Sequence, residues 1–193
     1  SWQQHTSASG LMAVEFFEQS IKADPNNALA YAGLAEAHLD LVDVFLAPDE
    51  TMPKARDAAN EALRLDPDLA EAHAVLARVN MVYDLDWQEA KRRMLRAVDL
   101  NPNLASARSG MAMFLAATGS TDAALEQMAL SLRLDPYSAM IADHAGMVYY
   151  MTREYDLLVP HSLRYLDIFP NNPNIHMWLG AGYAQMGEYD KAI

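Results

Sequence analysis

Five prolines recur at nearly even spacing along the chain, and each lies in a similar phrase. They are Pro25, Pro67, Pro102, Pro136 and Pro170, within KADPNN, RLDPDL, DLNPNL, RLDPYS and DIFPNN. The steps between successive prolines are 42, 35, 34 and 34 residues. A unit of about 34 residues closed by a proline-containing turn is typical of helix-turn-helix arrays. The period therefore predicts a stack of helix pairs, an architecture that binds other molecules more often than it catalyses.

Small and large apolar residues recur at fixed offsets from these prolines. Nine and ten residues after each proline stand Leu34-Ala35, Leu76-Ala77, Met111-Ala112, Ala145-Gly146 and Leu179-Gly180. Twelve residues before each proline stand Ala13, Ala55, Ala90, Ala124 and Leu158, and eight before stand Phe17, Ala59, Met94, Met128 and Ser162. Spacings of three and four place such residues on one helical stripe, and small residues let a paired helix approach closely. The pattern predicts two packed helices in each unit.

These residues make the chain resemble the tetratricopeptide repeat family over essentially its whole length, with WLGAGYAQMGEYDKA as the best single copy. The resemblance implies an all-α, right-handed superhelical solenoid of antiparallel helix pairs. The phrases YAGLAEAHLDL, DLDWQEAKRRMLRAVDLNPN and AATGSTDAALEQMALSLRLDP also resemble repeat regions of bacterial signalling proteins. Examples are class III adenylate cyclases and winged-helix transcriptional regulators, although no cyclase or winged-helix motif is present here.

The repeat divides the chain into one solenoid fragment, residues 1–193. It comprises a partial repeat 1–27, repeats at about 28–69, 70–104, 105–138 and 139–172, and a truncated repeat 173–193. We predict a lone helix from about Ser9 to Ala23. First helices are predicted near Ala28, Ala70, Leu104, Ser138 and Asn174, and second helices near Met52, Trp87, Thr121 and Tyr155. Both ends are expected to continue into further repeats of a longer parent protein.

Two places depart from the regular repeat. The first step is eight residues longer than the 34-residue steps, and the excess lies around LVDVFLAPDET, between Leu41 and Thr51. Lengthened helices with a wider turn explain it more simply than a dedicated binding loop. The second departure is Pro160, because proline inside a helix removes a hydrogen bond and costs ~3 kcal/mol. The helix that contains it is expected to start late or to bend there.

The composition restricts the partners of the chain. Its 14 basic residues are spread among 26 acidic ones, for a formal net charge of -12, which disfavours nucleic acid as a partner. No apolar run approaches the ~20 residues that span a bilayer, so we predict a soluble protein without membrane contact. Cysteine is absent, which removes disulfides and thiolate metal sites without selecting a compartment. Cytoplasm is the default expectation, with the periplasm open as an alternative.

No catalytic constellation is present. The sequence has no HExxH, GxGxxG, GxxxxGK or GxSxG motif, and its six histidines are scattered. His38, His73 and His176 occupy offsets of the packed seam and are interpreted as core residues rather than ligands. The acids before prolines, such as Asp24, Asp66 and Asp135, are explained by turn formation. We predict no enzyme, no cofactor and no metal site.

A binding surface is instead expected on the first helices, which line the concave face in the tetratricopeptide repeat family. Offsets four, seven, eleven and fourteen from the proline share one helical stripe. The predicted groove residues are Glu36, Glu71, Arg78, Met113, Met140, Asp143, Met147, Tyr150 and Met177, with Trp178 at the flank. A single cation, Arg78, disfavours a clamp for a terminal carboxylate. Methionines beside an aromatic ring suit an apolar helix or extended peptide, although packing between helices would also explain them.

Three classes of function follow from these observations. The leading one is a protein-interaction module that holds a peptide or helix, possibly basic and amphipathic, as a regulatory part of a larger bacterial signalling protein. The alternative is a structural solenoid that mediates self-association, giving a homo-oligomer, or contact with a catalytic or DNA-binding domain of the same protein. An enzyme is the least favoured class.

Overall fold

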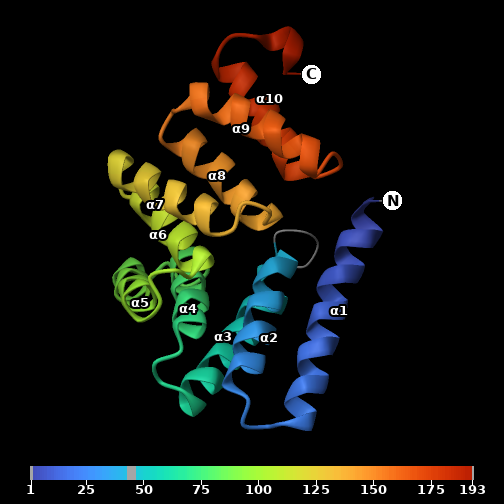
Figure 1. The fold of residues 1–193 in the computed structure, drawn as a ribbon, viewed down its shortest axis with the longest axis vertical. Coiled ribbons are helices and arrows are strands. Elements are labelled where there is room, and N and C mark those ends of the chain that lie inside the picture. Colours follow the sequence, from blue (N-terminus) through green and yellow to red (C-terminus); the bar gives the residue numbers. More distant parts are fainter. Residues whose placement is uncertain (1, 43–46, 193) are drawn as a thin grey trace. The chain divides into compact units, whose positions relative to one another are not determined.

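The computed structural model describes residues 2–42 and 47–192, and these form ten α-helices, one short 3-10 helix and no strand (Figure 1). The helices are α1 (Trp2–Ala23), α2 (Ala28–Val42), α3 (Pro48–Leu65), α4 (Ala70–Val82), α5 (Trp87–Leu100), α6 (Ala105–Ala117), α7 (Thr121–Leu134), α8 (Ala139–Met151), α9 (Tyr155–Ile168) and α10 (Pro173–Gln185), followed by η1 (Tyr189–Lys191). None of these helices combines the length and apolar character that crossing a bilayer requires.

The helix starts agree closely with those predicted from the repeat. Three of the predicted second helices begin at the predicted residue, namely α5, α7 and α9, and the first helices begin within one residue of prediction. Two helices differ. α1 begins at Trp2, seven residues ahead of the predicted Ser9, and α3 begins at Pro48, four residues ahead of the predicted Met52. Periodic apolar residues set the interior of a helix, whereas its ends depend on capping and turns that periodicity does not contain.

The turns at four of the five prolines, Pro170 being the exception, are closed by the residue that precedes the proline. The side-chain oxygens of Asp24, Asp66, Asn101 and Asp135 each accept a hydrogen bond from the backbone N–H two residues further along, at 3.0 to 3.3 Å. Such a bond fixes the backbone where one helix ends and before the next begins. The interpretation of these acids as turn residues is confirmed.

The eight extra residues of the first unit lie mostly in longer helices. α2 has 15 residues and α3 has 18, whereas α4 and α5 have 13 and 14. The predicted lengthening of the helices is therefore confirmed. Residues 43–46, at the centre of the segment singled out in the sequence, lie outside the described residues.

The chain divides into two compact units, one ending at Ala107 and one beginning at Arg108. In the first, consecutive helices from α1 to α5 pack as neighbours, and in the second α7 to α10 do the same. Four residues of the seam predicted for the second helices are fully buried, namely Ala55, Ala90, Ala124 and Leu158, whereas Ala13 and Phe17 of α1 are only half-buried. The structure describes each unit by itself, so the organisation as one continuous solenoid, with its handedness, stays a prediction.

Leu158 takes the place that alanine occupies in the other repeats, and its bulk is accommodated by a glycine in the next helix. A Cβ atom built at Gly182 of α10 would lie 3.3 Å from the Leu158 side chain and 2.8 Å from that of Val159. Residues at the same offset in the earlier repeats are larger: Ala37, Val79, Phe114 and Val148. The large residue and the small one have thus exchanged places between α9 and α10.

Pro160 does not delay its helix, so the predicted late start is wrong. α9 begins at Tyr155 and runs through Pro160 to Ile168. Pro160 and Asp156 are both exposed, so water can reach the Asp156 carbonyl that the missing N–H would otherwise bind. A local bend at Pro160 stays a prediction.

The three histidines predicted to be core residues differ in their burial. His38 is buried and His73 is half-buried, but His176 is exposed, so its assignment to the core is wrong. The ring Nε2 atoms of His73 and His176 hydrogen bond to the carbonyls of Pro67 and Pro170, at 3.1 and 2.9 Å. Each ring therefore caps its own turn through Nε2.

Candidate functional site

The predicted groove residues of the second unit gather where α10 crosses the exposed face of α8. Asp143 is the centre of the arrangement. Its Oδ1 accepts a hydrogen bond of 2.6 Å from Trp178 Nε1, and its Oδ2 accepts one of 3.3 Å from Asn174 Nδ2. The Trp178 ring lies 5.7 Å from the Tyr150 ring, measured between centroids. The structure therefore brings Asp143, Tyr150 and Trp178 together, as the stripe predicts.

Gly146 lets the Trp178 ring lie directly on α8. A Cβ atom at this position would approach Trp178 Cδ1 to 2.5 Å, closer than side chains tolerate. The sequence identified Gly146 only as a seam residue. The signal that could have revealed its role is the tryptophan eight residues after Pro170, which needs a small residue opposite it. With its ring seated and its N–H bonded, Trp178 is held in one orientation.

The methionines differ in how far they reach solvent. Met177 is 53% exposed, and Met140 and Met147 are partly exposed, so their place in a groove stays a prediction. Met113 is only 6% exposed, which contradicts its prediction as a groove residue. α8 comes close to α6 here, because the fully buried Ser109 hydroxyl lies 3.1 Å from His144 Nδ1. With small side chains beside it on α6, Met113 fills the interior.

The charged members of the predicted groove form a cluster between α2 and α4 of the first unit. Arg78 Nη1 lies 4.0 Å from Asp40 Oδ1, and only 11% of the Arg78 side chain is exposed. Burial raises the pKa of Glu36, Arg78 opposes that rise, and Glu71 adds to it. Two acids and one cation predicted from two successive repeats thus share one electrostatic environment. The predicted stripe did not include Asp40, the fourth residue of this cluster.

The raised pKa of Glu36 predicts that its charge costs folding stability. The folded protein holds this proton more tightly than the unfolded chain, so stability falls as the pH rises through the folded-state pKa. Glu36→Gln is therefore expected to raise the urea midpoint at neutral pH. The difference should shrink on acidification and vanish below about pH 4.3, where glutamate is protonated even when unfolded. Glu126→Gln, an exposed change on α7, is the control, and a lower midpoint for Glu36→Gln at neutral pH would contradict the expectation.

The acidic cluster and the methionine surface lie in different units of the chain. Glu36, Glu71 and Arg78 belong to the unit that ends at Ala107, and the tryptophan surface belongs to the unit that begins at Arg108. A single groove with acids at one end and methionines at the other stays a prediction. Within residues 2–42 and 47–192, no three His, Cys, Asp or Glu side chains gather as a metal site would require.

Comparison of the sequence with protein-family models and with curated proteins finds no match. Solved structures do match. The human IFIT1 dimer with m7Gppp-AAAA is 22% identical with a TM-score of 0.77, over 95% of this chain and 44% of that one. A chain of the APC/C hetero-tetramer Cut9-Hcn1 is 16% identical with a TM-score of 0.71, over 97% and 36%. YrrB, described as a TPR protein with an unusual peptide-binding site, is 25% identical with a TM-score of 0.52, over 87% and 82%.

These neighbours are tetratricopeptide repeat proteins, and the described residues are all-helical, so the predicted all-α, tetratricopeptide-like class is confirmed. The fold supports a general role in protein interaction or scaffolding. This chain spans less than half of the IFIT1 and Cut9-Hcn1 chains that it matches. The further resemblance to regions of adenylate cyclases and winged-helix regulators gains no support from these neighbours, and the absence of catalysis stays a prediction.

Proposed function

We propose that the surface formed by α8 and α10 binds the apolar side of a peptide or helix from a partner protein. The observation that carries this proposal is the exposed Met177 beside Trp178, whose ring is fixed by Asp143 and Gly146. A rigid aromatic ring offers contact area at little entropic cost, and flexible methionines adapt to the partner around it. Interfaces of this kind derive most of their affinity from such buried anchors.

The charge of the chain favours a basic partner. The net charge of -12 and the acids Glu36, Asp40 and Glu71 of the first unit attract cationic segments and raise their rate of encounter. A basic amphipathic helix suits this charge, with its apolar side on Trp178. We further propose that the chain is a regulatory part of a larger bacterial signalling protein, a context that rests on the resemblance of its repeats.

The change Met177→Lys tests the surface. A fluorescent, amphipathic helical peptide of leucine and lysine serves as the probe, and its binding is followed by anisotropy. The variant is expected to bind the probe at least tenfold more weakly, because the lysine removes an apolar contact and repels the peptide, a loss of about 1.4 kcal/mol or more. Stability should change by no more than about 0.5 kcal/mol, since Met177 is exposed.

The matched control is Met186→Lys, which adds the same charge at an exposed methionine just after α10. It should bind the probe as wild type does. Equal weakening by both variants would show that net charge alone attracts the peptide. The proposal that the α8–α10 surface binds it would then be contradicted.

A second candidate function, self-association or contact with another domain of the same protein, is favoured by α1. Leu11, Met12 and Phe16 are exposed on this helix, and Phe16 is 67% exposed. Sedimentation of the same proteins separates the two functions. A dimer that Phe16→Glu dissociates, together with no binding of the probe, would replace peptide binding by self-association.

A further inference from the structure

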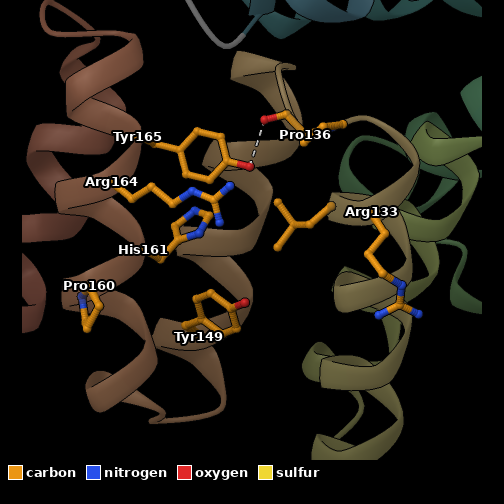
Figure 2. Close-up of a pocket in the computed structure, with 8 residues that line it drawn as sticks. Arg133, Pro136, Tyr149, Pro160, His161, Arg164 and Tyr165 are labelled. Carbon is orange, nitrogen blue, oxygen red and sulfur yellow. Dashed lines mark hydrogen bonds between the residues drawn. The ribbon is translucent and has the colours of Figure 1, made fainter.

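A pocket of about 510 Å³ lies on the side of the second unit formed by α7 and α9, with α8 beneath it (Figure 2). Arg133 comes from α7, Tyr149 from α8, and Arg164 from α9. The full lining is Leu132, Arg133, Pro136, Tyr149, Pro160, His161, Arg164 and Tyr165. A volume of this size suits a small group of side chains or a small ligand.

The two arginines of this pocket differ from most others in the chain. Arg56, Arg64, Arg92, Arg93 and Arg96 each pair with a carboxylate. Arg133 and Arg164 form no ion pair with any described residue, and no acid is among the residues that line the pocket. In a chain with 26 acids and 14 bases, such a cationic pocket is the place where an incoming carboxylate finds donors without competition.

The aromatic wall of the pocket is held rigidly. Tyr165 donates a hydrogen bond of 3.0 Å to the Pro136 carbonyl, drawn as a dashed line in Figure 2. His161 Nε2 donates one of 2.8 Å to the Ala142 carbonyl, and the His161 ring lies 4.6 Å from the Tyr165 ring and 5.4 Å from the Tyr149 ring, between centroids. These rings need no reorganisation to receive an apolar or aromatic side chain.

Arg164 is placed over this wall. Its guanidinium carbon lies 5.7 Å from the centroid of the Tyr165 ring, within the range of a cation–π contact. A guanidinium that packs on a ring through its face keeps its N–H edge available, and that edge matches the two oxygens of a carboxylate. The Arg164 guanidinium therefore lies beside the rigid rings, whereas Arg133 lines the opposite side of the pocket and points away from them (Figure 2).

We propose that this pocket binds an acidic segment of a partner protein, with carboxylates on Arg133 and Arg164 and an aromatic side chain against Tyr149 and Pro160. Two cations match a few carboxylates, whereas the net charge of -12 opposes a long polyanion such as nucleic acid. The site uses the second helices α7 and α9 and prefers acids, so it is separate from the α8–α10 surface and goes beyond the function proposed for that surface.

The test uses a short, acetylated, fluorescent peptide that alternates glutamate and phenylalanine, and a peptide with glutamine in place of glutamate. Wild type is expected to bind the glutamate peptide at least tenfold more tightly. Arg133→Gln and Arg164→Gln should each weaken that binding by about tenfold or more, because each removes a charge-assisted hydrogen bond. Both arginines are exposed, so the unfolding midpoints should stay unchanged.

Arg153→Gln is the matched control, because Arg153 is exposed in the same unit but does not line the pocket. It should bind the glutamate peptide as wild type does. Equal weakening by all three arginine variants, or equal affinity for the two peptides, would overturn the proposal. Displacement of the peptide by inorganic phosphate at an equal concentration would also overturn it, in favour of a phosphate site.

Met177→Lys distinguishes this site from the α8–α10 surface. Met177 lies on α10 and does not line the pocket, so the variant should bind the glutamate peptide as wild type does. Loss of glutamate-peptide binding in this variant would show that the acidic peptide occupies the tryptophan surface instead.

Discussion

Leu158→Ala is expected to lower the free energy of unfolding by about 2–5 kcal/mol. The Leu158 side chain is fully buried in α9. Gly182 leaves no side chain that could move into the space vacated by the leucine, so the cavity should stay open and the cost should lie toward the upper part of this range. Urea denaturation followed by circular dichroism measures the change.

The control for this prediction lies on the same helix. Leu163 is 45% exposed, so Leu163→Ala removes the same atoms without opening a closed cavity. Its effect should stay below about 1 kcal/mol. Equal effects of the two changes would mean that Leu158 is not part of the core and that α9 presents a different face to α10.

Gly146→Ala is expected to destabilise the protein by about 1–3 kcal/mol, although alanine is the better helix former. The added methyl group would meet the Trp178 ring at 2.5 Å, and the hydrogen bond from Trp178 to Asp143 resists displacement of that ring. The tryptophan fluorescence should change together with stability, because the Trp178 ring must move away from α8.

The same substitution should have the opposite sign when the tryptophan is absent. In a Trp178→Ala background the methyl group meets no ring, and Gly146→Ala should stabilise the helix by about 0.5–1 kcal/mol. A complete double-mutant cycle in urea measures this reversal. Destabilisation of equal size in both backgrounds would show that the glycine is needed for another reason and that it does not seat the ring.

Regular spacing allowed much of the fold to be predicted. The alanines and methionines before Pro67, Pro102 and Pro136 are buried because these repeats present the same helical stripe to their neighbours. The acids before the prolines act locally, through hydrogen bonds that span two residues, and local interactions can be read from one short phrase. These features depend on the sequence within one repeat.

The features that sequence reasoning missed depend on pairs of residues in different repeats. Met113 is buried because α8 comes close to α6, and Asp143 is fixed by Trp178, which lies 35 residues away. The pocket near Arg133 and Arg164 is lined by residues from three helices, and the spacing of these residues in the sequence does not predict it. The size of a side chain in one repeat decides which side chains of the next repeat are exposed. The repeat period carries no information about these sizes.

The exchange of size between Leu158 and Gly182 limits how this gene can be rearranged. Repeat proteins gain and lose whole units by recombination between similar stretches of DNA. A crossover that joined α9 to a repeat with phenylalanine or valine at the place of Gly182 would overfill the junction, and one that joined α10 to a second helix with alanine would leave it hollow. Separating α9 from α10 should therefore destabilise the junction, and designers who trim or extend the array should cut elsewhere.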